Sequence, residues 1–144
     1  MNRVIKDVGF VHLHVHTSFS LREGALTIAK LGKLAAADNQ PALAITDTNN
    51  LFGALEFSDA LADKGIQPII GLDIRVDVTP PEQAASKFQQ QATGLKRFAS
   101  LVLLAQDEMG YANLMKLSSM AFLEVADNAE PHVSFAKLEE HAAG

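Results

Sequence analysis

The 144-residue sequence contains no cysteine. This absence excludes disulfide cross-links and thiolate zinc sites. Without cysteines, the sequence does not indicate directly whether the protein works in an oxidising or a reducing compartment. An excess of positive charge is also missing, because twelve Lys and Arg residues face seventeen Asp and Glu residues, for a formal net charge of −5. Such a chain lacks the basic stripe typical of nucleic-acid-binding domains, so we expect no strong DNA binding by these residues alone.

Long apolar runs are missing as well. No stretch approaches the ~18 apolar residues of a membrane span, and the opening MNRVIKDVGF lacks the apolar core of a signal peptide. We therefore expect a cytoplasmic protein that does not enter a membrane. With 48% hydrophobic and 20% charged residues, the chain can bury a core, and we expect one globular domain or part of one.

Short apolar runs alternate with helical patterns, which indicates an α/β protein built from βα units. We predict strands at 9–17, 42–46, 67–78 and 98–105, and helices at 25–39, at 51–65, after Asp107 and after Ser134. Within 67–78, alternation places Leu72, Ile74, Val76 and Val78 on one face. The Pro-, Gln- and Ala-rich residues 79–96 predict a flexible excursion. The expected architecture is a parallel sheet with helices on its outer side.

The first predicted strand carries three histidines at alternate positions, in HLHVH. Because strand side chains alternate between faces, His12, His14 and His16 should project from the same face. Neutral imidazole is a favoured ligand for Zn, Mn or Fe, so two such histidines can converge on one ion. The alternative is an exposed strand face with incidental histidines, but three in register favour a present or ancestral metal site.

Three acidic residues fall where a parallel βα fold brings side chains together, near the ends of the strands. Glu23 closes the first βα loop, Asp47 follows the second strand and Asp73 lies in the third. Each acid also has a structural interpretation. Glu23 and Asp47 could cap the helices that follow them, and Asp73 could pair with a surface Lys or Arg. Both interpretations stay open at this point.

Four stretches carry a family resemblance: HLHVHTSFSLREGA, PALAITDTNNLFGALEF, GIQPIIGLDIRV and SLVLLAQDEMGYANLMKLSSMAFLE. In this order they resemble the N-terminal PHP (polymerase and histidinol phosphatase) domain of bacterial DNA polymerase III alpha subunits. The resemblance implies a distorted barrel of about seven βα units. Residues 1–144 would be the N-terminal part of that domain, an incomplete barrel without the polymerase domains. In metal-competent members, up to three metals at the strand ends hydrolyse phosphoesters.

The resemblance also implies which residues would bind metal. His14 and His16 match the first ligand pair of the family, and His12 precedes them. Glu23 stands where an Asp is usual, and Asp73 stands where many members have Glu, so both positions keep a carboxylate.

Two further positions depart from the metal-competent pattern. Thr48 and Ser100 stand where those members have histidines, and a hydroxyl is a much poorer ligand than an imidazole for a transition metal. The remaining family ligands belong to later strands that these residues do not include. The resemblance therefore implies a degenerate site that binds Zn or Mn weakly or not at all.

Two functions are compatible with this resemblance. In the first, the domain is catalytically decayed, supports the polymerase domains, and docks a separate proofreading exonuclease subunit and other replicase subunits. Its parent chain would contact DNA and extend a primer with two Mg ions in a later domain. In the second, the domain is an active metal-dependent phosphoesterase or 3′–5′ exonuclease. Thr48 and Ser100 favour the first, and we assign no catalytic residue.

Overall fold

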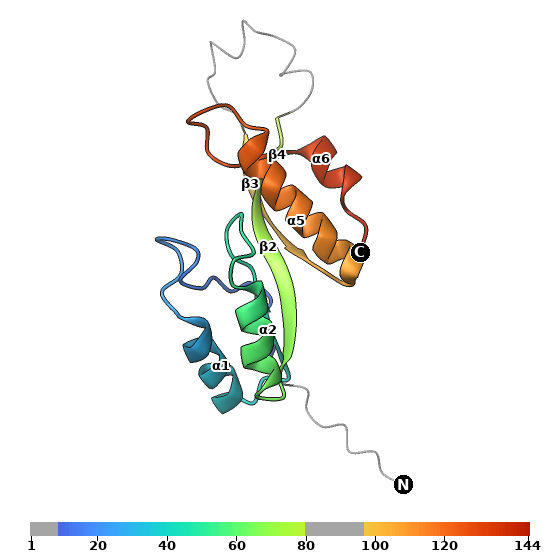
Figure 1. The fold of residues 1–144 in the computed structure, drawn as a ribbon. Helices are drawn as coiled ribbons and strands as arrows, with labels where there is room; N and C mark the ends of the chain where they lie inside the picture. The colour runs from blue at the N-terminus through green and yellow to red at the C-terminus, as the bar shows by residue number, and fades with distance from the viewer. Residues whose placement is uncertain (1–8, 80–96) are drawn as a thin grey trace, which may run out of the picture.

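The computed structural model describes residues 9–79 and 97–144, which form an α/β unit. Its helices are α1 (Ile28–Ala37), α2 (Ala54–Ala62), α5 (Glu108–Leu123) and α6 (Phe135–Glu140). Its strands are β1 (Ala42–Ile45), β2 (Gln67–Asp77), β3 (Phe98–Leu104) and β4 (Val133–Ser134). The long strand β2 runs through the molecule, with α1 and α2 beside its first part and α5 and α6 beside its last part (Figure 1). The predicted α/β class is confirmed.

Strand β2 pairs in parallel with β1 and with β4, and antiparallel with β3. The expected parallel pairing is therefore confirmed for β1 and β4, whereas β3 runs in the opposite direction. A parallel neighbour needs a crossover connection, usually a helix, whereas an antiparallel neighbour does not. The flexible excursion predicted for 79–96 lies, apart from Thr79, outside the described residues.

The predicted first strand, 9–17, is not a regular strand. It runs beside β1, where the carbonyls of His12 and Val15 accept hydrogen bonds from the amides of Ala44 and Thr46, each at 2.9 Å. The amide of Val15 donates instead to the hydroxyl of Thr46, also at 2.9 Å. A side chain thus takes the place of a backbone acceptor, and the ladder stays incomplete.

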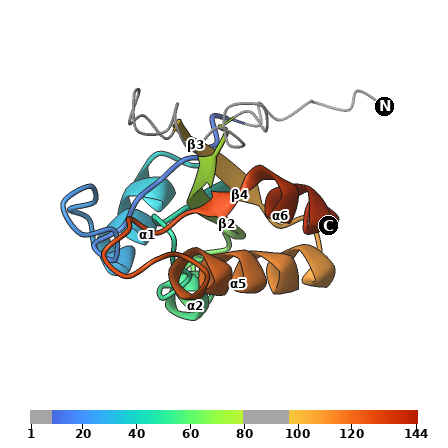
Figure 2. The ribbon, with the colours of Figure 1, turned by 90° about the horizontal axis from the view of Figure 1, so that it is seen from above.

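Two hydrophobic clusters pack against the sheet. The first joins α1 and α2 to β1 through Ile28, Leu31, Ala35, Leu43, Ile45, Phe57, Leu61 and Ile66. The second joins α5, β4 and α6 to β2 through Leu72, Ile74, Val76, Leu114, Leu117, Ala121, Val133 and Leu138. Helix α6 lies beside α5 in both views (Figure 1 and Figure 2). Of the four residues predicted to share one face of the third strand, Leu72, Ile74 and Val76 are buried, whereas Val78 is 40% exposed beyond the end of β2.

The helices begin and end close to the predicted signals. Asn39 and Gly65 follow α1 and α2 with positive φ angles of 55° and 68°, a conformation that ends helices. Helix α5 begins after Asp107, as predicted, and Asp107 is its N-cap: Oδ1 of Asp107 accepts a hydrogen bond from the Gly110 amide at 2.9 Å. Within α5, Leu114, Leu117 and Ala121 are buried, whereas the side chain of Phe122 is 53% exposed.

Candidate metal site

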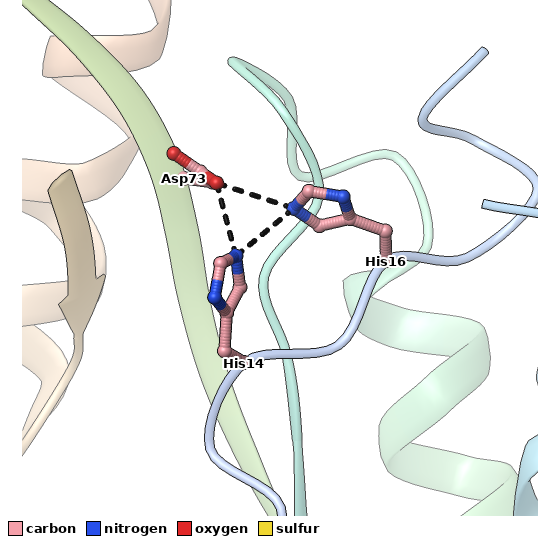
Figure 3. Close-up of side chains that lie close together, drawn as sticks. All are labelled: His14, His16 and Asp73. Carbon is pink, nitrogen blue, oxygen red and sulfur yellow. Dashed lines mark hydrogen bonds and ion pairs between the residues drawn. The ribbon is translucent and has the colours of Figure 1, made fainter. Parts of the chain in front are cut away.

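His14, His16 and Asp73 point toward one another from two separate segments (Figure 3). The Nε2 atoms of His14 and His16 lie 3.0 and 3.2 Å from Oδ2 of Asp73, and 3.3 Å from each other. The side chain of Asp73 is 8% exposed, and those of His14 and His16 are 57% and 20% exposed. The cluster is therefore buried at Asp73 in β2 and exposed to solvent at His14.

The cluster can hold a metal ion. One ligand atom from each residue lies within 4.8 Å of the others. Two imidazole nitrogens and one carboxylate oxygen are a donor set that zinc and similar divalent ions accept in proteins. These residues therefore fit one divalent cation.

Glu23 lies on the other side of the His16 ring. Its Oε2 atom is 3.6 Å from Nδ1 of His16, whereas Asp73 faces Nε2 of the same ring. A carboxylate on the second ring nitrogen of a histidine fixes the orientation of that ring. In this arrangement Glu23 contacts His16 rather than joining the three-atom cluster.

The hydroxyls of Thr48 and Ser100 both contact carboxylates. Thr48 Oγ1 donates a hydrogen bond to Oε2 of Glu23, and Ser100 Oγ donates one to Oδ1 of Asp73. The β2–β3 register brings Ser100 here, because Ser100 pairs with Arg75, two residues from Asp73. Each hydroxyl thus uses a carboxylate oxygen as an acceptor.

His12 lies apart from these contacts. Its ring packs edge-on against Phe10, with 4.7 Å between the ring centroids. The alternation of the sequence predicted one face for all three histidines, but only His14 and His16 join the cluster. The irregular backbone of residues 9–17 accounts for this, because strict alternation holds only in a regular strand.

Asp47 neither caps a helix nor joins the cluster. Helix α2 has Gly53 as its N-cap, and α1 has Thr27, so the capping interpretation is wrong for both Asp47 and Glu23. The carboxylate of Asp47 instead accepts hydrogen bonds from Thr17 and Ser20. Sequence reasoning missed these two residues, although Thr17 directly follows the HxH pattern and Ser20 lies four positions after His16.

Similarity to known proteins identifies the family to which this chain belongs. The family model of the PHP domain matches residues 12–144, so the chain belongs to the PHP domain family. Among curated proteins, DNA polymerase III subunit alpha of Caulobacter vibrioides is 46% identical over 139 residues, which cover 94% of this chain and 11% of that protein. The corresponding subunit of Treponema pallidum is 41% identical over 138 residues, with 95% and 11% covered. The chain spans about a tenth of the length of these relatives.

A solved structure supports the fold. An amidohydrolase from Chromobacterium violaceum, with bound sulfate and no metal, matches 76% of this chain and 34% of that chain, with a TM-score of 0.51 and 24% sequence identity. The expected family and the expected partial-barrel fold are thus confirmed. In the part of the chain that the structure describes, no helix is long and apolar enough to cross a membrane.

Proposed function

We propose that this chain is the PHP module of a replicative DNA polymerase of the polymerase III alpha type, serving as a structural and docking domain with a degenerate metal site. Its similarity to two such subunits over more than nine tenths of its length supports this proposal. DNA contact, primer extension and the Mg ions that such chemistry needs would belong to parts of the longer relatives outside these 144 residues.

The contacts of Ser100 and Thr48 carry the proposal of a degenerate site. Each stands at a family histidine position and donates a hydrogen bond to a carboxylate, of Asp73 and Glu23 respectively. Three protein ligands suffice to bind one zinc ion. Hydrolysis by several metals, however, also needs an ion that stabilises the leaving oxygen, and two imidazoles that would help to hold it are replaced here. We therefore propose weak binding of a single Zn or Mn ion.

An active metal-dependent phosphoesterase or 3′–5′ exonuclease is the alternative. The convergence of His14, His16 and Asp73, with His14 open to solvent, favours it. A single ion with an open coordination position can activate a water molecule.

A hydrolysis assay separates these two functions. The chain is incubated with Zn²⁺ or Mn²⁺ and a generic phosphodiester, and we expect negligible turnover. Turnover that His14→Ala abolishes and His141→Ala preserves would replace our proposal with the hydrolase. His141 is a matched control because it lies at the end of α6, where its ring contacts the carbonyl of Lys137.

The docking role is tested with a partner. Because the relatives are named as one subunit of a polymerase, we propose that the module binds a separate proofreading exonuclease subunit and assembles with other replicase subunits. Sedimentation of the chain with the purified exonuclease subunit of the same replicase should show a complex. Independent sedimentation of both proteins at tens of micromolar would contradict docking and leave the metal-site proposal untouched.

A further inference from the structure

Asp47 is a buried acid whose contacts reach the segments that carry the candidate metal ligands. Its side chain is enclosed, with 1% of the residue exposed. Oδ1 accepts hydrogen bonds from the Thr17 amide at 2.7 Å and the Ser20 hydroxyl at 2.5 Å, and Oδ2 accepts one from the Thr17 hydroxyl at 2.7 Å. Its own carbonyl accepts the amide of Asp73 at 3.1 Å. One residue therefore bonds to three points of the chain around the cluster, at Thr17, Ser20 and Asp73.

Each of these points lies next to a residue of the site. Thr17 follows His16 directly, and Asp73 is itself part of the cluster. The Ser20 hydroxyl accepts the Thr48 amide at 3.0 Å, and the Ser20 carbonyl accepts the Glu23 amide at 3.1 Å. The bonds of Asp47 thus set the relative positions of the His16 backbone, the Glu23 loop and β2.

The charge of Asp47 has no basic partner within residues 9–79 and 97–144, where the ion pairs all involve other acids. A buried carboxylate without a cation depends on its hydrogen bonds, so the three donors together compensate for the burial of Asp47. This requirement makes the loop geometry specific. Each donor has to stay in place for the others to be satisfied.

We infer that Asp47 is the positioning residue of the metal site. Its carboxylate fixes the backbone that carries His16, and its carbonyl fixes Asp73, so that the imidazole and carboxylate donors converge. This inference rests on the proposed metal site. Residues that orient metal ligands typically change affinity ~10- to 100-fold when they are replaced, although they never touch the ion.

The test replaces one carboxylate oxygen with a donor. Asp47→Asn keeps the size of the side chain but places an amide NH₂ against groups that already donate. The matched control, Asp59→Asn, removes the same charge from the exposed surface of α2. Two quantities are measured in the 144-residue chain: the ¹⁵N signals of the His14 and His16 imidazoles without metal, and the Zn²⁺ affinity by calorimetry.

We expect Asp47→Asn to change the imidazole signals of His16 and to weaken Zn²⁺ binding ~10- to 100-fold, while Asp59→Asn changes neither. Urea denaturation of each variant checks that the protein is folded under the conditions in which the Zn²⁺ affinity is measured. If Asp47 only stabilised the fold, Asp47→Asn would lower the free energy of unfolding and leave the imidazole signals and the Zn²⁺ affinity unchanged. This result would overturn the inference.

Two further variants keep the test decisive if Asp47→Asn does not fold. Thr17→Val removes the hydroxyl donor to Asp47, and Thr17→Ser retains it. The first should shift the His16 signals and the second should preserve them; equal signals in both would overturn the inference. Because the imidazole signals are read without metal, a wild-type chain that binds no Zn²⁺ would end the metal-site proposal while the role of Asp47 remained measurable.

Discussion

At the residue scale, two hydroxyl groups donate hydrogen bonds to the carboxylates in and beside the cluster. An imidazole at position 100 would offer a nitrogen lone pair to a metal, whereas Ser100 donates its proton to Asp73. The same contrast applies to Thr48 and Glu23. The resemblance to a known family identified both positions from the sequence. That their hydroxyls bond directly to the remaining carboxylates is visible only in the structure.

Gly24 also acts at this scale. A Cβ atom at Gly24 would lie 2.0 Å from the carbonyl oxygen of Thr17, so the loop closes only around glycine. We predict that Gly24→Ala lowers the free energy of unfolding by about 1–3 kcal/mol, because backbone atoms would have to move apart. Urea denaturation measures this change.

Gly32 provides the matched control for Gly24. It lies within α1, where the atoms nearest to an added Cβ would be side-chain carbons of Lys64, at 3.2 Å, and of Leu61, at 3.6 Å. Gly32→Ala should leave stability unchanged or raise it by up to about 1 kcal/mol, because alanine favours the helix. Equal effects of the two substitutions would contradict the account of the loop.

At the scale of the elements, local sequence patterns predicted the positions of helices and strands better than they predicted how the strands pair. Buried runs located β1 and β2, and Asn39 and Gly65 marked the ends of α1 and α2. The direction of β3 depends on which strand lies beside it, and a local pattern does not contain that information. The contacts of Asp47 have the same character, since they join residues 27 to 30 positions apart.

Phe57 tests the packing of one element. It is fully buried in the first hydrophobic cluster, where α2 meets β1. Phe57→Ala should lower the free energy of unfolding by about 3–5 kcal/mol, through lost burial and the cavity that remains. Phe52 precedes the same helix and is 76% exposed, so Phe52→Ala should change stability by less than about 0.5 kcal/mol. A cost for Phe52→Ala as large as that for Phe57→Ala would show that this cluster is misplaced.

At the scale of the whole molecule, β3 presents an open edge. Within the described residues it pairs with β2 alone, and its large apolar side chains Phe98, Leu101 and Leu104 are 36%, 42% and 38% exposed. An unpaired apolar strand edge is a template for pairing with another chain. Within the described residues, this edge therefore leaves apolar surface exposed.

We predict that the 144-residue chain self-associates through this edge. Leu101→Lys should shift the population toward monomer, because a charge on an edge strand opposes pairing. Leu55→Lys is the control, since Leu55 is 76% exposed on α2 and away from the edge. Light scattering across a concentration series measures the mass, and a monomeric wild-type chain at all concentrations would contradict the prediction.

The degenerate metal site is the central claim, and calorimetric titration with Zn²⁺ tests it most directly. We predict weak binding of at most one ion to the unmodified chain, and tighter binding to the double variant Thr48→His, Ser100→His, because each restored imidazole adds a direct bond. This gain should disappear below about pH 6, where imidazoles bind protons in place of metal. Tight binding of several ions by the unmodified chain, with a phosphodiesterase activity that His14→Ala abolishes, would contradict the account.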